Sequence, residues 1–92
     1  MRRKDLAKPY GLSAEEYDAL LLKQAGKCAL CSLPFYEGKA GQPVLDHNHS
    51  TNKLREFLHG KCNLALGGFG DSLSVCRLAV EYLEKHMKGE NA

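Results

Sequence analysis

The stretch Asp46-His47-Asn48-His49 places a carboxylate and two imidazoles almost side by side in the chain. On one side of it lies Cys28-Ala29-Leu30-Cys31, and on the other lies His59-Gly60-Lys61-Cys62, which Asn63 follows directly. Pairs of cysteine or histidine ligands at this spacing are typical of zinc knuckles. The pattern predicts a reaction centre held between the two halves of a metal-binding scaffold.

The four cysteines allow a second interpretation, because they could instead form disulfides. Two disulfides would need an oxidising compartment, and the sequence has no recognisable signal peptide. We therefore expect one structural zinc with a closed tetrahedral ligand set. Cys76 falls inside the apolar pattern of a later helix and is expected to be a small buried residue. The expected zinc ligands are Cys28, Cys31, His59 and Cys62.

The length of 92 residues indicates one small domain, expected over residues 10–92. A chain of this size buries only about 60–65% of its unfolded surface, so a zinc staple would add stability that the core cannot supply. Residues 1–9 are expected to form a basic arm, either solvated or in contact with phosphate. The formal charge of +2 does not by itself indicate nucleic acid. No apolar run could span a bilayer, so we expect a soluble cytoplasmic protein without membrane contact.

Two longer helices are expected to flank the centre. Ser13 and Glu16 form a capping-box pattern, and Gly26 is the expected C-cap of the helix that follows. Asp71 or Ser72 should begin a last helix that ends near residue 86 or 88. Apolar residues recur at helical spacing in both helices, which predicts buried faces. The first face comprises Tyr17, Leu20, Leu21 and Gln24, and the second comprises Val75, Leu78, Ala79, Tyr82 and Leu83.

Between these helices the sequence predicts a hairpin and a short helix, and so an α+β fold. Residues 44–47 and 53–58 read as two strands around a polar turn, with Leu54 toward the core. Residues 63–66 begin the short helix, which the following glycine pair ends. Phe35 and Tyr36 are expected to pack against the knuckle rather than to stack on bases.

The polar cluster contains the groups that metal-assisted hydrolysis needs. The carboxylate of Asp46 and the amide oxygen of Asn63 are hard ligands that suit magnesium, and the imidazole of His47 is the natural base for a hydrolytic water. In an ideal strand Asp46 and His47 would point to opposite faces, although a twisted strand end could bring them closer. The alternative is structural: these residues would only hydrogen-bond the hairpin or support the zinc site.

The chain from Tyr10 to Leu83 resembles the recombination endonuclease VII group of HNH (ββα-metal) nucleases. The resemblance rests on the spacing of several short motifs taken together. They are Tyr10-Gly11-Leu12-Ser13 with Glu15-Glu16-Tyr17, Cys28-Ala29-Leu30-Cys31, Asp46-His47-Asn48-His49, Thr51 with Leu54-Arg55, Cys62-Asn63 with Leu66-Gly67, and Ala79, Tyr82 and Leu83.

The resemblance implies a DNA endonuclease that needs Mg²⁺ or Mn²⁺ besides the structural Zn²⁺. Asp46 and Asn63 would hold the catalytic ion, and His47 would be the general base. His49 would contact the scissile phosphate or orient the site. The products would carry 5′-phosphate and 3′-hydroxyl ends. DNA is then the expected partner, a homodimer is left open, and the setting would be a phage or its bacterial host.

The chain also departs from the family pattern. His59 stands where the family usually has cysteine, and Asn52 and Glu56 replace hairpin glycines. Asn52 can adopt a left-handed turn conformation at little cost. The chain has no room for the long helices that embrace DNA junctions in the phage resolvase, so junction resolution is not implied. The alternative function is a non-catalytic zinc module that binds nucleic acid or protein.

Overall fold

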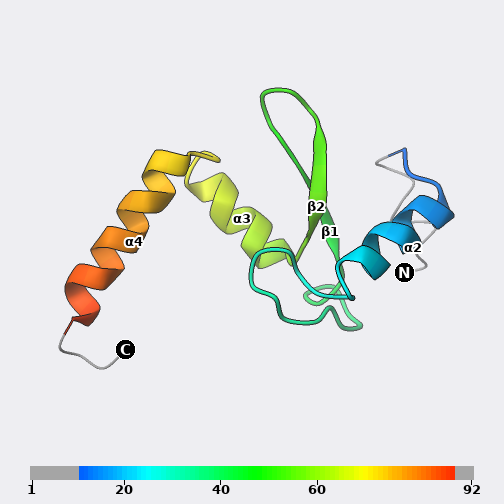
Figure 1. The fold of residues 1–92 in the computed structure, drawn as a ribbon, viewed down its shortest axis with the longest axis horizontal. Coiled ribbons are helices and arrows are strands. Elements are labelled where there is room, and N and C mark those ends of the chain that lie inside the picture. The colour runs from blue at the N-terminus through cyan, green and yellow to red at the C-terminus, as the bar shows by residue number, and fades with distance from the viewer. Residues whose placement is uncertain (1–10, 89–92) are drawn as a thin grey trace.

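The structure is a computed structural model that describes residues 11–88, so the expected basic arm at residues 1–9 lies outside the described residues. A two-stranded hairpin stands between helices, as predicted for an α+β fold. One helix precedes the hairpin in the chain and lies beside it. Two others follow the hairpin and extend away from it (Figure 1). The elements in chain order are α2 (Ala14–Lys23), β1 (Val44–His47), β2 (Leu54–Leu58), α3 (Gly60–Gly68) and α4 (Leu73–Met87).

Helix α2 begins with the predicted capping box. The Ser13 hydroxyl accepts from the Glu16 amide at 3.0 Å, and the Glu16 carboxylate accepts from the Ser13 amide at 2.9 Å. The C-cap is Gln24 rather than the predicted Gly26. Gly26 follows with a φ of 67° and donates its N–H to the Leu21 carbonyl, which is how glycine commonly closes a helix end.

The main apolar core joins α2 to the hairpin. Tyr17, Leu45 and Phe57 are buried together, and the rings of Tyr17 and Phe57 lie 4.8 Å apart. The side chain of Gln24 reinforces this contact by pairing with the backbone of Phe57. It accepts from the Phe57 N–H at 2.8 Å and donates to the Phe57 carbonyl at 2.9 Å. This side chain therefore takes the place of a third strand at one point of β2.

The hairpin is antiparallel and contains an irregularity at its polar residues. Leu45 pairs with Phe57, but His47 pairs with Leu54, so the register shifts between these two pairs. Leu54 is exposed, so its predicted core position is wrong: it lies beside the turn of the hairpin, and Phe57 supplies the buried ring. In the turn Asn52 has a φ of 64°, as predicted for a left-handed position.

Helix α3 starts three residues earlier than predicted. His59 is its N-cap, and the His59 carbonyl accepts from the amides of Cys62 and Asn63, both at 3.0 Å. Cys62 and Asn63 therefore lie in the first turn. Gly67 and Gly68 fall inside the helix rather than after it, and Phe69 is the C-cap.

Helix α4 begins as predicted after Ser72, whose hydroxyl accepts from the Val75 amide at 3.2 Å. The prediction of a buried face on this helix is wrong, because no residue of α4 is buried. Leu78, for example, is 61% exposed. Cys76 is half-buried rather than buried. Within the part of the chain that the structure describes, no helix is both long and apolar enough to cross a membrane.

Candidate metal centre and active site

The four predicted zinc ligands meet in one place. The turn after α2 supplies Cys28 and Cys31, while the start of α3 supplies His59 and Cys62. Their ligand atoms all lie within 4.8 Å of one another, and three of the four residues are buried. Tetrahedral zinc separates its sulfur and nitrogen ligands by roughly 3.5–3.8 Å, so small side-chain shifts would fit the cluster to the ion. The structure brings the four predicted residues together, and the donor set suits structural zinc; that they bind zinc stays a prediction.

The contacts of the His59 ring indicate which of its nitrogens would bind a metal ion. Nδ1 lies 3.3 Å from the sulfur of Cys31, inside the cluster. Nε2 lies 3.2 Å from the carbonyl oxygen of Pro34, to which an N–H at this position donates. A carbonyl partner of this kind fixes the tautomer and leaves the other nitrogen free to bind metal. In a zinc-bound cluster His59 would therefore use Nδ1, with its ring oriented by the Pro34 carbonyl.

The surroundings of Cys28 and Cys62 shift the pKa values of their thiols in opposite directions. Burial alone would raise the pKa of the Cys28 thiol, but the amides of Cys31, His59 and Leu30 donate toward its sulfur and lower the pKa to about 6. Burial and the neighbouring sulfurs raise the pKa of Cys62 to about 11. Cys28 therefore ionises first, and Cys62 needs the charge of a cation to become a thiolate.

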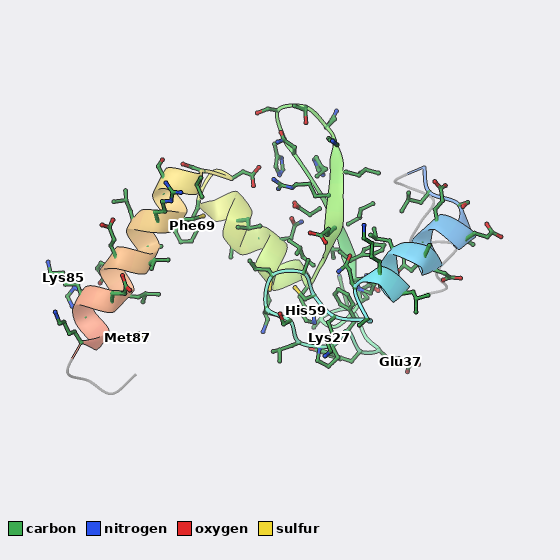
Figure 2. The ribbon with its side chains drawn as sticks, viewed as in Figure 1. Lys27, Glu37, His59, Phe69, Lys85 and Met87 are labelled. Carbon is green, nitrogen blue, oxygen red and sulfur yellow. The ribbon has the colours of Figure 1, made fainter. Side chains whose placement is uncertain are left out.

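Aromatic side chains cover the knuckle as predicted for Phe35 and only in part for Tyr36. Phe35 is half-buried against both core clusters, and its ring centre lies 5.0 Å from that of His59. The Tyr36 ring centre lies 6.3 Å from that of His59, and most of this side chain is exposed. It also lies so close to Gly41 that an added Cβ would meet its ring at 2.3 Å. The loop around His59 is seen at the base of the hairpin in Figure 2.

The polar cluster lies at the register shift of the hairpin. Between the pairs Leu45–Phe57 and His47–Leu54, the residue Asp46 faces two residues of β2. A bulge of this kind increases the local twist and re-aims side chains, which relaxes the strict alternation of an ideal strand. Asp46 is 5% exposed and His47 is half-buried. The register shift thus gives the irregular strand that the sequence interpretation needed at Asp46 and His47.

Asp46 has a partner that the sequence interpretation did not assign. The Nε of Arg55 donates to its Oδ2 at 2.5 Å. The other two guanidinium nitrogens of Arg55 donate to both oxygens of Asp71, at 3.2 and 2.9 Å. A buried carboxylate needs a charged or hydrogen-bonding partner, and this requirement was the available signal for Arg55.

The two histidines of the cluster lie together, while Asn63 is held by a different contact. The ring centres of His47 and His49 are 4.6 Å apart, and His49 is exposed. Asn63 is half-buried in α3, which packs against β1. Its backbone N–H donates to the His59 carbonyl. The described contacts therefore place Asn63 in the first turn of α3, directly after Cys62, and none of them joins it to Asp46.

The carboxyl group of Asp71 lies near the side chains of Arg55, His49 and His47. The hydrogen bond from Arg55 lowers the pKa of the Asp71 carboxyl, and the charges of His49 and His47 act in the same direction. The hydrogen bonds to Asp46 and Asp71 raise the pKa of Arg55 above its ordinary value. The guanidinium of Arg55 thus lies between the carboxylates of Asp46 and Asp71.

Comparison with known proteins supports a specific family. The sequence model of "Recombination endonuclease VII" matches residues 3–85. Two similar proteins are the Gene 59 protein of Mycobacterium phage D29, 36% identical over 77 residues, and that of Mycobacterium phage L5, 33% identical over 75 residues. These matches cover 83% and 80% of this chain but only 46% and 44% of the relatives.

No solved structure was found to match the chain. The family model nevertheless spans the zinc ligands, the polar cluster and nearly all of α4. The zinc-ligand group that the structure assembles agrees with the resemblance seen in the sequence. This chain belongs to the recombination endonuclease VII family.

Proposed function

We propose that this chain is a metal-dependent endonuclease of the HNH (ββα-metal) type that hydrolyses phosphodiester bonds in DNA, most simply by nicking one strand. The observation that supports this most directly is the position of Asp46 and His47 at the hairpin bulge, in a chain of the recombination endonuclease VII family. The order of hairpin and helix, β1 then β2 then α3, agrees with a ββα-metal site.

The residues present fit a divalent ion. Asp46 uses Oδ2 for Arg55, which leaves Oδ1 for a cation, and Asn63 offers an amide oxygen from the adjacent helix. Carboxylate and amide oxygens are the ligand types that Mg²⁺ and Mn²⁺ accept, with water and phosphate completing the set. When bound, the ion would stabilise negative charge on the phosphate and on the departing 3′ oxygen.

The histidines would handle the water and the phosphate. His47 would accept a proton from the attacking water on a ring nitrogen, as a general base. His49, exposed and in contact with the His47 ring, would meet the scissile phosphate or orient His47. Attack by water at phosphorus with departure of the 3′ oxygen yields 5′-phosphate and 3′-hydroxyl ends.

A plasmid assay tests this proposal. The zinc-loaded protein should convert supercoiled DNA to the nicked form with Mg²⁺ or Mn²⁺, and brief chelation should stop cleavage without changing the circular dichroism. His47→Ala should lower the rate by about two to four orders of magnitude with little change in melting temperature. His86→Ala is the matched control, because His86 is exposed on α4. A His47→Ala protein that cuts at half the parent rate would exclude the general-base role.

A second candidate is the non-catalytic zinc module that binds nucleic acid or protein. One observation favours it: the carboxylate of Asp46 is already paired with Arg55, as a purely structural acid would be. DNA binding without cleavage by the parent protein, in either metal, would support this function instead.

A further inference from the structure

Arg55 connects two carboxylates that lie far apart in the sequence. Its Nε donates to Asp46 on β1, and its two terminal nitrogens donate to the two oxygens of Asp71 in the connection between α3 and α4. The side chains of Asp46, Arg55 and Asp71 are 7%, 34% and 21% exposed. All three are thus partly withdrawn from water, where paired charges hold a more definite geometry than on an open surface.

Arg55 leaves one oxygen of Asp46 without a described hydrogen bond. Arg55 engages only one oxygen of Asp46 and does so through Nε, so the carboxylate is oriented while its second oxygen remains available. A shallow hollow beside the pair is lined by Leu30, Leu58 and Leu66 as well as by Asp46 and Arg55. The acidic side chain therefore borders open space although it is nearly buried.

Asp71 holds the guanidinium of Arg55 from a second side. Its two oxygens accept from the two terminal nitrogens of Arg55, while Nε donates to Asp46. The planar group is therefore fixed between two carboxylates. The fork to Asp71 thus orients Arg55, and Arg55 in turn orients the carboxylate of Asp46.

The backbone of Asp71 is built to make this contact. Asp71 has a φ of 57°, a left-handed conformation that costs free energy in a non-glycine residue and that aspartate tolerates better than most. Its N–H donates to the Leu66 carbonyl at 2.9 Å, at the end of α3. Since Asn63 lies in the first turn of α3, Arg55 ties the strand that carries Asp46 to the helix that carries Asn63.

We propose that Arg55 and Asp71 are positioning residues for the divalent-ion site, and that they orient Asp46 so that its second carboxylate oxygen can bind the ion. This inference rests on the proposed function, which needs Asp46 as an ion ligand. Neither residue has to touch the ion or the DNA. The class of ligand concerned is a hard divalent cation such as Mg²⁺ or Mn²⁺.

The test measures Mn²⁺ binding to the zinc-loaded protein by calorimetry, in the absence of DNA. Groups that orient a metal ligand typically contribute about 10- to 100-fold in affinity. Asp71→Asn should therefore weaken Mn²⁺ binding by about 10-fold or more, with the zinc content and the melting temperature close to those of the parent. Glu81→Gln is the control, because it removes one carboxylate charge from an exposed position on α4.

A double-mutant cycle then separates positioning from general electrostatics. Arg55→Lys keeps the charge but loses the planar fork, so it should weaken Mn²⁺ binding to a similar extent. If Asp71 acts through Arg55, then adding Asp71→Asn to Arg55→Lys should change the affinity by less than about 2-fold. Independent, multiplying effects would overturn the proposal, because Asp71 would then act only by its charge.

The outcomes distinguish this proposal from the proposed function. If the parent binds Mn²⁺ and cleaves DNA while Asp71→Asn binds Mn²⁺ equally well, the positioning role is wrong and the nuclease stands. If Mn²⁺ binding depends on Asp46 and Asp71 but no DNA is cleaved, the positioning role stands and the nuclease is wrong. If the parent binds no Mn²⁺, the positioning role is wrong whatever the cleavage assay shows.

Discussion

Phe57 on β2 and Leu78 on α4 are both apolar residues in regular elements, yet Phe57 is fully buried and Leu78 is 61% exposed. The difference lies in which other segments of the chain pack against each residue. The hairpin receives α2 on one side and the zinc ligands at its base, whereas α4 follows α3 to the far end of the molecule (Figure 1). Labelled side chains such as Lys85 and Met87 lie far from His59 in Figure 2.

This comparison shows that an apolar stripe on a helix does not identify what the stripe contacts. Burial in the hairpin region depends on segments that are distant in sequence, since Gln24 bonds Phe57 and the turn at Cys28 meets His59. In a domain this small, local propensity alone cannot bury a second face. Four predictions test the contrast, beginning with the largest expected effect.

Loss of the zinc site should unfold the hairpin region. Structural zinc can supply on the order of 10 kcal/mol to a small domain, so His59→Ala should lose zinc and melt at a markedly lower temperature. His59→Cys should keep zinc, because the ion accepts sulfur at about 2.3 Å or nitrogen at about 2.0–2.1 Å. It should still melt slightly lower, since the contact with the Pro34 carbonyl is lost.

Native mass spectrometry beside a melting curve measures both properties. Cys76→Ala is the control, because Cys76 lies outside the ligand cluster. The assignment of the fourth ligand would be wrong if His59→Ala kept its zinc and its melting temperature while Cys76→Ala lost both.

Removal of the buried ring tests the apolar half of the same region. Phe57→Ala should lower the free energy of unfolding by about 3–5 kcal/mol, since the ring of Tyr17 and the side chain of Leu45 would border a cavity. Chemical denaturation of the zinc-loaded protein measures the change. A loss below about 1 kcal/mol would mean that this core contributes little beside the metal.

Removal of the Gln24 side chain, which takes the place of a third strand beside Phe57, should have a smaller effect on the free energy of unfolding. Gln24→Ala leaves the N–H of Phe57 without its partner, which should cost about 1–3 kcal/mol, while the Phe57 carbonyl still accepts from the Ala29 N–H. Lys23→Ala, at the neighbouring exposed position, should change stability by less than about 0.5 kcal/mol. Equal denaturation midpoints for the two variants would show that water replaces the amide of Gln24 at no cost.

Helix α4 should give the smallest effect on the folded monomer. Leu78→Ser removes an apolar side chain that is already in solvent, so the free energy of unfolding should change by less than about 0.5 kcal/mol. The measurement is the same denaturation experiment. A loss above about 2 kcal/mol would mean that this face is packed in solution, and the contrast with the hairpin region would fail.

Features that depend on neighbours in the sequence were predicted well. The capping box at Ser13, the strand at residues 44–47, the left-handed Asn52 and the Ser72 cap all appear in the structure. Each depends on contacts within a few residues, where side-chain chemistry alone limits the backbone. The roles of the polar cluster in catalysis stay predictions.

The zinc ligands, too, were determined by the sequence itself, because the spacing of Cys28 and Cys31 and of His59 and Cys62 admits few other chemistries. Only the tertiary structure decided that the hairpin bulges at Asp46, that Arg55 joins this residue to Asp71, and that α4 buries no face. These outcomes depend on which distant atoms meet. Periodicity and spacing carry no information about such partners, since a side chain lacks them until the whole chain has folded.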